Sequence, residues 1–289
     1  MSEPKGRVAV RTEERRRSDE GRQRLKAARR RAGPALHAEW TKTRTAGGAI
    51  WLLLAVIAAT VAVGIAVATA TRCPAAGCGQ DPAKVSLSGI YLGQALVAVL
   101  AVLAIGGEYS TGMILVTLTA MPRRTAMLAA KAAILTGMVL VAGAVAVLGS
   151  MLAGRLILSG HGFNPAHGYP LLSLADGPYL RAAAGSVLYL GLVGLLGLGI
   201  ATATRDSMVA VGVVLGLLYL FPVVTAAVSN PHWQRFLERI APMSAGLAIQ
   251  ATTGLRGMPI SPWAGLGVLA AWAAGAMLAG GLLLQIRDA

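Results

Sequence analysis

The chain has 289 residues, of which 55% are hydrophobic, and its 26 Lys and Arg outnumber its 12 Asp and Glu, giving a net charge of +14. Twenty of these 38 charged residues lie within residues 1–46, so the other 243 residues carry 18 charges, about 7%, against roughly 25% in soluble domains. Such a composition cannot cover a water-facing surface. It excludes a soluble globular protein and indicates a membrane protein.

The charged N-terminal region holds 14 Lys and Arg and 6 Asp and Glu within residues 1–46. Its basic run, residues 22–31, has no aromatic side chain on which a base could stack, so we expect no nucleic-acid partner. Segments rich in charge and poor in apolar residues do not build a packed core. We expect residues 1–35 to be a disordered cytoplasmic tail that contacts anionic lipid, or alternatively a specific partner.

Six apolar runs follow, each of about 20 residues, which is the length that a helix needs to cross the hydrocarbon core of a bilayer. None of these runs contains Asp, Glu, Lys, Arg or His. We therefore expect an all-α polytopic membrane protein in which residues 36–289 form one six-span domain. The predicted spans are residues 49–71, 87–107, 132–154, 182–204, 207–229 and 263–286.

The even number of spans places both termini on one side of the membrane. That side carries ten Lys and Arg from residue 29 onwards, against seven in the opposite loops. Because Lys and Arg are enriched in cytoplasmic loops, the sequence predicts a multi-pass protein of the cell (cytoplasmic) membrane with both termini in the cytoplasm.

The connections between the spans differ in length and composition. Only Arg205 and Asp206 separate the fourth and fifth spans, which predicts antiparallel neighbours. Within the cytoplasmic segment 108–131, the apolar stretch 112–121 is too short to cross, so we expect a helix that lies at the membrane surface or under the bundle. On the external side, the small-residue run 241–254 fits a short helix that dips back into the outer leaflet against protein.

The sequence lacks the motifs of several chemistries. It has no glycine-rich phosphate-binding loop ending in Lys-Ser or Lys-Thr and no H-E-x-x-H metal motif, so we expect neither an enzyme nor a bound cofactor. The predicted spans also lack the carboxylates with which ion-coupled carriers bind a proton or sodium ion. The energy for any uphill transport would therefore come from another subunit.

The first external loop contains both cysteines of the chain, Cys73 and Cys78. On the oxidising side of a membrane this pair can form a disulfide, and the alternative is two free thiols. His161 and His167 could join Asp176 in an external metal site. Ordinary loop histidines are the simpler interpretation, and we expect no metal.

Two segments carry a family likeness. Residues 36–45, L-H-A-E-W-T-K-T-R-T, precede the first span and fit a short amphipathic helix in the headgroup layer. Residues 107–112, G-E-Y-S-T-G, are followed by M-P-R-R at 121–124. These segments resemble the elbow helix and the coupling loop of ABC-2-type permeases, the membrane subunits of bacterial ATP-binding-cassette exporters, although Met113 stands where the family commonly has Thr. Residues 240–246 resemble the external segment before the family's last span.

The resemblance implies a permease subunit of an ATP-driven exporter, paired with a second permease chain, alike or different, and with a separate cytoplasmic ATPase. The apolar spans favour an apolar or amphipathic substrate. The elbow residues would be Glu39, Trp40, Lys42 and Arg44. The coupling helix would dock on the ATPase through Glu108, Tyr109, Thr111, Gly112, Pro122, Arg123, Arg124 and Lys131.

The residues of the coupling segment also have simpler interpretations. Glu108 could be a plain interfacial acid that ends the second span, and the basic residues could anchor the cytoplasmic side. An acid at the start and bases at the end equally complement a helix dipole. A membrane anchor or immunity-type subunit that binds a partner without transporting anything would share the same layout, and it is the alternative to the exporter subunit.

Overall fold

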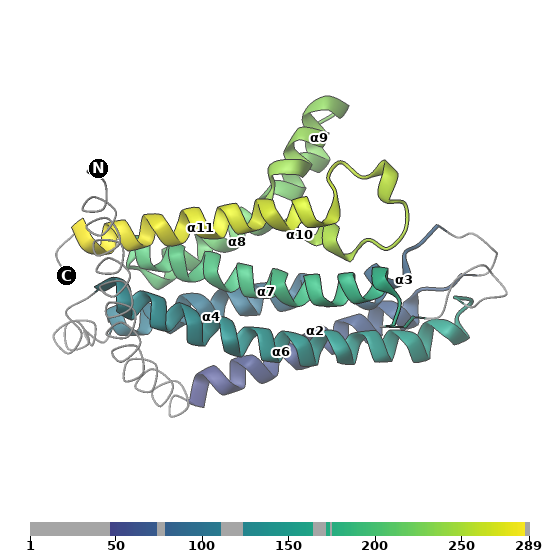
Figure 1. The fold of residues 1–289 in the computed structure, drawn as a ribbon, viewed down its shortest axis with the longest axis horizontal. Coiled ribbons are helices and arrows are strands. Elements are labelled where there is room, and N and C mark those ends of the chain that lie inside the picture. The colour runs from purple at the N-terminus through teal and green to yellow at the C-terminus, as the bar shows by residue number, and fades with distance from the viewer. Residues whose placement is uncertain (1–46, 74–78, 111–123, 164–171, 174, 287–289) are drawn as a thin grey trace, which may run out of the picture.

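The computed structural model describes residues 47–73, 79–110, 124–163, 172–173 and 175–286. Every regular element in these residues is a helix. Six of the helices are long and apolar enough to cross a membrane, which confirms the six predicted spans. They run along the long axis of the molecule (Figure 1) and are α2 (Gly47–Ala70), α4 (Ile90–Ser110), α6 (Arg124–Gly160), α7 (Gly177–Thr204), α8 (Ser207–Ala227) and α11 (Pro262–Ile286).

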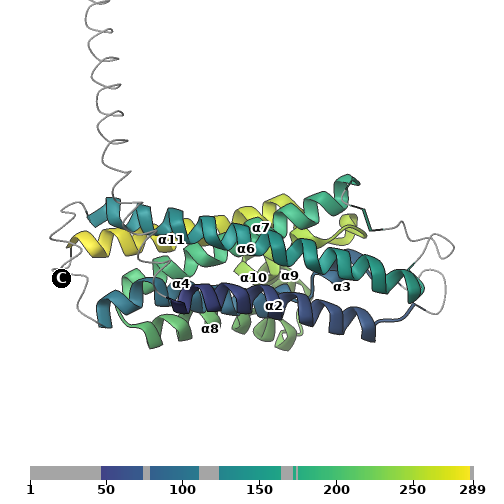
Figure 2. The same cartoon turned by 90° about the horizontal axis from the view of Figure 1, so that it is seen from below.

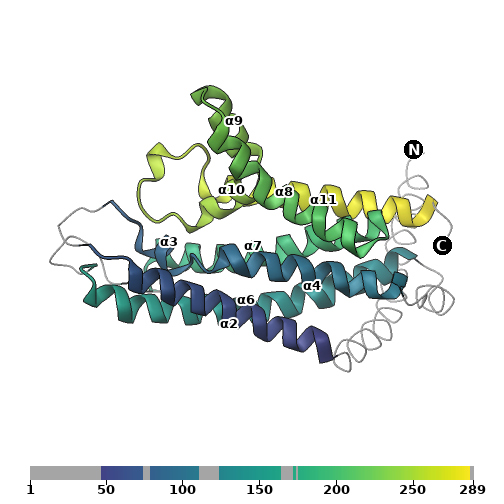
Figure 3. The ribbon, with the colours of Figure 1, turned by 180° about the vertical axis from the view of Figure 1, so that it is seen from behind.

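The bundle has two ends, which we name by the elements that they carry. At the proximal end, α2 and α6 begin and α4 and α11 finish (Figure 1). At the distal end lie the shorter elements α3 (Pro82–Ser86), α9 (Pro231–Ile240) and α10 (Pro242–Leu247) (Figure 3). Successive long helices therefore alternate in direction, as consecutive spans of a membrane protein must.

Helix α7 lies at the centre of the bundle. It contacts α4, α6, α8 and α11, and 67% of its most apolar stretch is buried, against 17% in α2. Glycines bring the neighbours close: Gly191 faces Leu140 of α6, and Gly197 faces Ala101 of α4. Such small residues let helices approach closely and are the usual means of association in lipid.

The peripheral helices α2, α8 and α11 keep most of their surface exposed. Figure 2 shows α2 beside α6, and α8 on the far side of the bundle from α11. Large apolar side chains such as Leu220 and Leu278 lie on these surfaces, 60% and 68% exposed. Extensive apolar exposure is expected where the solvent is hydrocarbon rather than water.

Helices α6 and α7 extend furthest beyond the predicted spans. Helix α6 covers Arg124–Gly160 rather than 132–154, and α7 begins at Gly177 rather than at residue 182. The predicted limits were placed at the charged residues Lys131 and Arg181. Both residues instead lie inside the helices, because each side chain donates a hydrogen bond to a backbone carbonyl of another element.

The predicted external run 241–254 packs into the bundle. Most of α10 and all of the 3₁₀ turn η2 (Ala248–Gln250) are buried, against α7, α8 and α11. Helix α9 differs, because none of its residues is buried and it stands away from the other helices (Figures 1 and 3). Beyond η2, a second 3₁₀ turn, η3 (Leu255–Gly257), precedes α11.

Candidate functional site

The segment predicted to couple to an ATPase is flanked by two described helices. Glu108 and Tyr109 lie in the last turn of α4, and Arg124 is the first residue of α6. The side chains of these three residues, and the whole of residues 111–123, lie outside the part of the chain that the structure describes. The predicted docking contacts of Thr111, Gly112, Pro122 and Arg123 therefore stay predictions, as do those of the elbow residues Glu39, Trp40, Lys42 and Arg44.

Lys131 is the one predicted coupling residue whose side chain the structure describes. It is buried on α6, and its Nζ donates a hydrogen bond to the carbonyl oxygen of Ala104 on α4, at 3.1 Å. A buried ammonium group is costly unless it is hydrogen-bonded, and the carbonyl partly meets that requirement. The contact joins the two helices that flank the predicted coupling segment, close to where both of them meet it.

The end of α4 also packs closely against the turn between α7 and α8. A Cβ built at Gly106 would lie 2.0 Å from Oγ of Ser207, so a larger residue here would force the Ser207 side chain to move. The turn itself is well specified: Arg205 adopts a left-handed conformation with φ of 59°, and the Asp206 carboxylate accepts a hydrogen bond from the Val209 N–H at 2.8 Å. A displacement of α4 at this end would therefore move α8 as well as α6.

The proximal parts of α7 and α11 touch through their backbones. A Cβ built at Gly199 would lie 2.6 Å from the carbonyl carbon of Ala276, and one built at Gly280 would lie 2.6 Å from the carbonyl oxygen of Gly199. Even a methyl group at either position would force the helices apart.

The distal end is joined by one carboxylate. Asp81 is buried, and it caps α3 by accepting the Ala83 N–H at 3.0 Å. It also accepts hydrogen bonds from the N–H of Thr252 at 2.5 Å, the Thr252 hydroxyl at 2.7 Å and the Thr253 N–H at 3.0 Å. One side chain thereby fixes the start of α3 to the loop after η2, 171 residues further along the chain.

Further polar side chains connect the buried helices. The Tyr189 hydroxyl of α7 donates to Oε1 of Gln94 on α4, and the Gln94 amide contacts the Met243 sulfur at 3.2 Å. Arg181 donates to the Ala251 carbonyl at 2.6 Å. Because a buried polar group without a partner is costly, these pairs fix the register of α4, α7 and the α10 segment.

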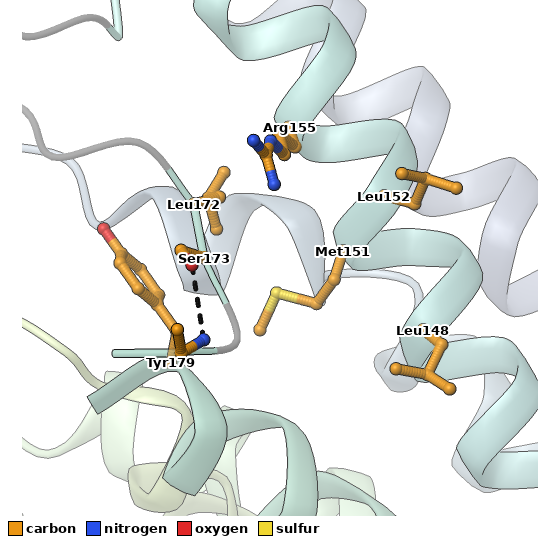
Figure 4. Close-up of a pocket in the computed structure, with 8 residues that line it drawn as sticks. Leu148, Met151, Leu152, Arg155, Leu172, Ser173 and Tyr179 are labelled. Atoms are coloured by element: carbon orange, nitrogen blue, oxygen red, sulfur yellow. Dashed lines mark hydrogen bonds between the residues drawn. The ribbon is translucent and has the colours of Figure 1, made fainter. Parts of the chain in front are cut away.

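The distal half also contains two hollows. One, of about 420 Å³, lies between α6, α7 and residues 172–175 (Figure 4). In this view Met151 and Arg155 extend from α6 towards Leu172, and the Ser173 hydroxyl accepts the Ala175 N–H at 3.2 Å. The hollow is mostly apolar, so it offers few groups for recognition. The other, of about 560 Å³, is lined by both apolar and charged side chains.

The structure describes one residue of the predicted cysteine pair. Cys73 is buried and disulfide-bonded, and Cys78 lies outside the described residues. Within the described residues, no group of three His, Cys, Asp or Glu side chains is placed to hold a metal ion. His161 approaches the carbonyl oxygen of Thr71 with Nδ1 at 3.2 Å, and His167 is not described.

Comparison with known proteins does not identify the chain. No protein-family model matches the sequence, and no curated protein matches it.

Sequence reasoning missed the polar residues that hold the distal end. An Asp-Pro pair at residues 81–82 is a recognisable helix start, since aspartate caps and proline is tolerated in the first turn. Gln94 and Tyr189 were visible as polar residues inside apolar runs. Their partners were not, because those partners lie on other helices.

Proposed function

We propose that the chain is the transmembrane permease subunit of an ATP-driven exporter of the ABC-2 type. It pairs with a separate cytoplasmic ATPase and with a second permease chain, and it moves an apolar or amphipathic substrate across the cell membrane. The likeness of residues 107–112 and 121–124 to the coupling loop of that family supports this proposal. In this arrangement the proximal end faces the cytoplasm, together with both termini.

The charge content of the spans supports an external source of energy. The six candidate spans contain no Asp or Glu, and their cationic residues, Lys131, Arg155 and Arg181, lie towards helix ends. Carriers driven by protons or sodium ions usually hold an ionisable group at membrane depth to bind the coupling ion. A permease without such a group needs a motor, and an ATPase subunit would supply one.

The observation that carries the proposal is the way the helices that flank the predicted coupling segment are joined to their neighbours at the proximal end. Lys131 joins α6 to α4, and Gly106 packs α4 against the start of α8. A push on the segment between α4 and α6 would therefore move three helices together. This is the mechanical property that docking to a nucleotide-driven subunit requires.

The first test is affinity purification of the tagged full chain from mild detergent, followed by mass spectrometry of the proteins that copurify. We expect a stoichiometric ATPase with a phosphate-binding loop. Glu108→Ala should lower the amount retained, because it removes the acid at the start of the coupling segment. The matched control is Asp176→Ala, which removes an exposed acid at the distal end.

A chain that purifies alone under gentle conditions would contradict the exporter proposal and favour an anchor or immunity-type subunit. Equal ATPase retention by Glu108→Ala and wild type would contradict the assigned interface while leaving the ATPase partnership standing.

The orientation has its own test. In a background without Cys73 and Cys78, single cysteines replace Arg205 in the α7–α8 turn or Arg256 in η3. A membrane-impermeant maleimide added to intact cells should label the cysteine at position 256 and spare the one at 205. The reverse pattern would invert the proposed topology.

A further inference from the structure

The larger distal hollow is a cleft formed by six helices and a loop. Residues of α2, α3, α4, α8, α9 and α10, together with the turn η2 and residues 258–260, line about 560 Å³. This volume lies within the range of about 300–1,000 Å³ that is typical of small-ligand sites. Its walls are mainly apolar and include Val67, Val85 and Ile260. A ligand that fills the cleft would bury hydrocarbon against these side chains.

Two side chains of opposite charge also line the cleft, from separate elements. Lys84 belongs to α3 and is exposed, whereas Glu238 belongs to α9 and is partly buried. Neither has a hydrogen bond or an ion pair with another residue that the structure describes, so they do not neutralise each other directly. A ligand that carries a positive and a negative group would match both of them.

An unpartnered hydroxyl lies in the same cleft. Oγ of Ser88 is buried and has no hydrogen-bond partner among the described residues, although Ser88 lines the hollow. Leaving such a buried group unpaired is costly, so a ligand oxygen that accepts its hydrogen would be favoured. Ser88 follows Lys84 by four residues, which places a donor and a cation in one short stretch of the cleft wall.

The position of α9 indicates the level of the cleft in a bilayer. This helix stands away from the spanning helices (Figure 3), and its apolar residues Trp233, Phe236, Leu237 and Ile240 recur at helical spacing. Trp233 and Phe236 stay about half exposed, at 57% and 47%. An amphipathic helix with exposed aromatic residues is typical of the boundary between headgroups and acyl chains. Glu238 on α9 would then lie at headgroup level, with the apolar walls below it.

We propose that this cleft binds one zwitterionic phospholipid of the outer leaflet, of the ethanolamine type. Its phosphate contacts Lys84 and the Ser88 hydroxyl, its ammonium contacts Glu238, and part of an acyl chain lies along Val67, Val85 and Ile260. The assignment to the outer leaflet rests on the proposed orientation of the chain, but the site itself does not depend on export, because a lipid can bind here whether or not the chain is coupled to an ATPase.

The test is native mass spectrometry of the purified full chain, delipidated and mixed with equal amounts of phosphatidylethanolamine and phosphatidylglycerol. We expect one tightly bound phosphatidylethanolamine, preferred over phosphatidylglycerol. Glu238→Gln should lower this preference about fivefold, the upper range for a partly exposed charge contact. Lys84→Gln should weaken the binding of both lipids by a similar factor. Arg256→Gln, a distal residue that does not line the cleft, is the control and should match wild type.

Folding does not confound the result, since neither Lys84 nor Glu238 makes a polar bond to any of the described residues. Thermal unfolding of each variant checks this directly. An unchanged lipid preference in Glu238→Gln would overturn the proposal, as would the absence of a tightly bound lipid on wild type. Displacement of the lipid by millimolar phosphoethanolamine would also overturn it, because the apolar walls would then contribute nothing.

Discussion

The two ends of the bundle are held together by different interactions. At the distal end, polar side chains connect residues far apart in sequence: Asp81 binds Thr252 and Thr253, and Arg181 binds the Ala251 carbonyl. At the proximal end, the described contacts include backbone packing of Gly199 against α11 and a hydrogen bond from Lys131 to Ala104. Close glycine packing occurs at the distal end too, where Gly265 meets the Ala245 carbonyl, so the polar links distinguish the two ends. Hydrogen bonds depend steeply on distance and angle, whereas packed helix surfaces can slide over one another.

This difference suggests where the bundle moves. A distal end fixed by directional bonds would act as a pivot, and a proximal end built on packing would respond to a push from outside. In the exporter proposal, the push comes from the ATPase at the segment between α4 and α6. The substitutions below test how strongly each end is held, in order of decreasing effect.

The largest effect is expected for Asp81→Ala at the distal end. The change removes the acceptor of three N–H groups and one hydroxyl. Hydrogen bonds to a charged group contribute about 1.5–3 kcal/mol each. Because water compensates part of this, we expect the free energy of unfolding to fall by about 3 kcal/mol. The measurement is the apparent melting temperature in detergent. Asp176→Ala is the control, because Asp176 precedes α7 without a side-chain capping bond. Equal melting temperatures for the two variants would contradict a stabilising role for the hydrogen bonds of Asp81.

The next effect concerns the proximal packing of α7 against α11. Gly280→Ala places a methyl group 2.6 Å from the Gly199 carbonyl oxygen, and overpacking of this kind typically costs about 1–3 kcal/mol. Gly275→Ala on the same helix is the matched control, since a Cβ there meets nothing within 4 Å. We expect only Gly280→Ala to lower the melting temperature. Equal destabilisation by Gly275→Ala would mean that the close contact at Gly280 is not the cause of the effect.

A smaller effect is expected for Lys131→Met, which keeps the length of the side chain and removes its hydrogen bond to Ala104. The net contribution of such a bond is about 1–2 kcal/mol, and methionine recovers part of it by packing. The comparison variant is Arg155→Met, on the same helix but exposed. We expect a lower melting temperature for Lys131→Met alone. Identical melting temperatures for the two variants would show that the hydrogen bond between Lys131 and Ala104 does not stabilise the chain.

The smallest effect belongs to α9. Trp233→Ala removes a side chain that is 57% exposed on a helix with no buried residue, so we expect a change within about 0.5 kcal/mol in detergent. Trp272→Phe provides the contrast, because its indole donates to the Ile240 carbonyl at 2.9 Å and holds the end of α9. If Trp233→Ala were the more destabilising of the two, α9 would be part of the folded core.

The number and order of the spans could be predicted from the sequence, because a bilayer requires long apolar helices and their composition is visible without a fold. The ends of the helices could not. Lys131 and Arg181 interrupt the hydropathy pattern, yet each lies within a helix because a carbonyl on another element accepts its proton. The sequence shows the charge but not the acceptor.

The partners of Asp81 could not be predicted from the sequence either. The Asp-Pro pair at residues 81–82 predicts a helix start, whereas Thr252 and Thr253 become partners of Asp81 only through the tertiary arrangement. The cleft residues Lys84 and Glu238 are likewise brought together by α3 and α9, which are separated in sequence by four spanning helices. Of the predicted coupling residues, the side chain of Lys131 alone is described, and the account of the others rests on the family resemblance.

The most direct test of the account is ATP hydrolysis by the complex of the chain with its copurified ATPase, reconstituted in lipid. We predict that Glu108→Ala and Pro122→Ala each lower the hydrolysis that depends on the permease, while leaving the melting temperature of the chain unchanged. Asp176→Ala, at the opposite end, should hydrolyse ATP like wild type. Unchanged hydrolysis in both Glu108→Ala and Pro122→Ala would contradict the assignment of the α4–α6 segment as the place where the motor acts.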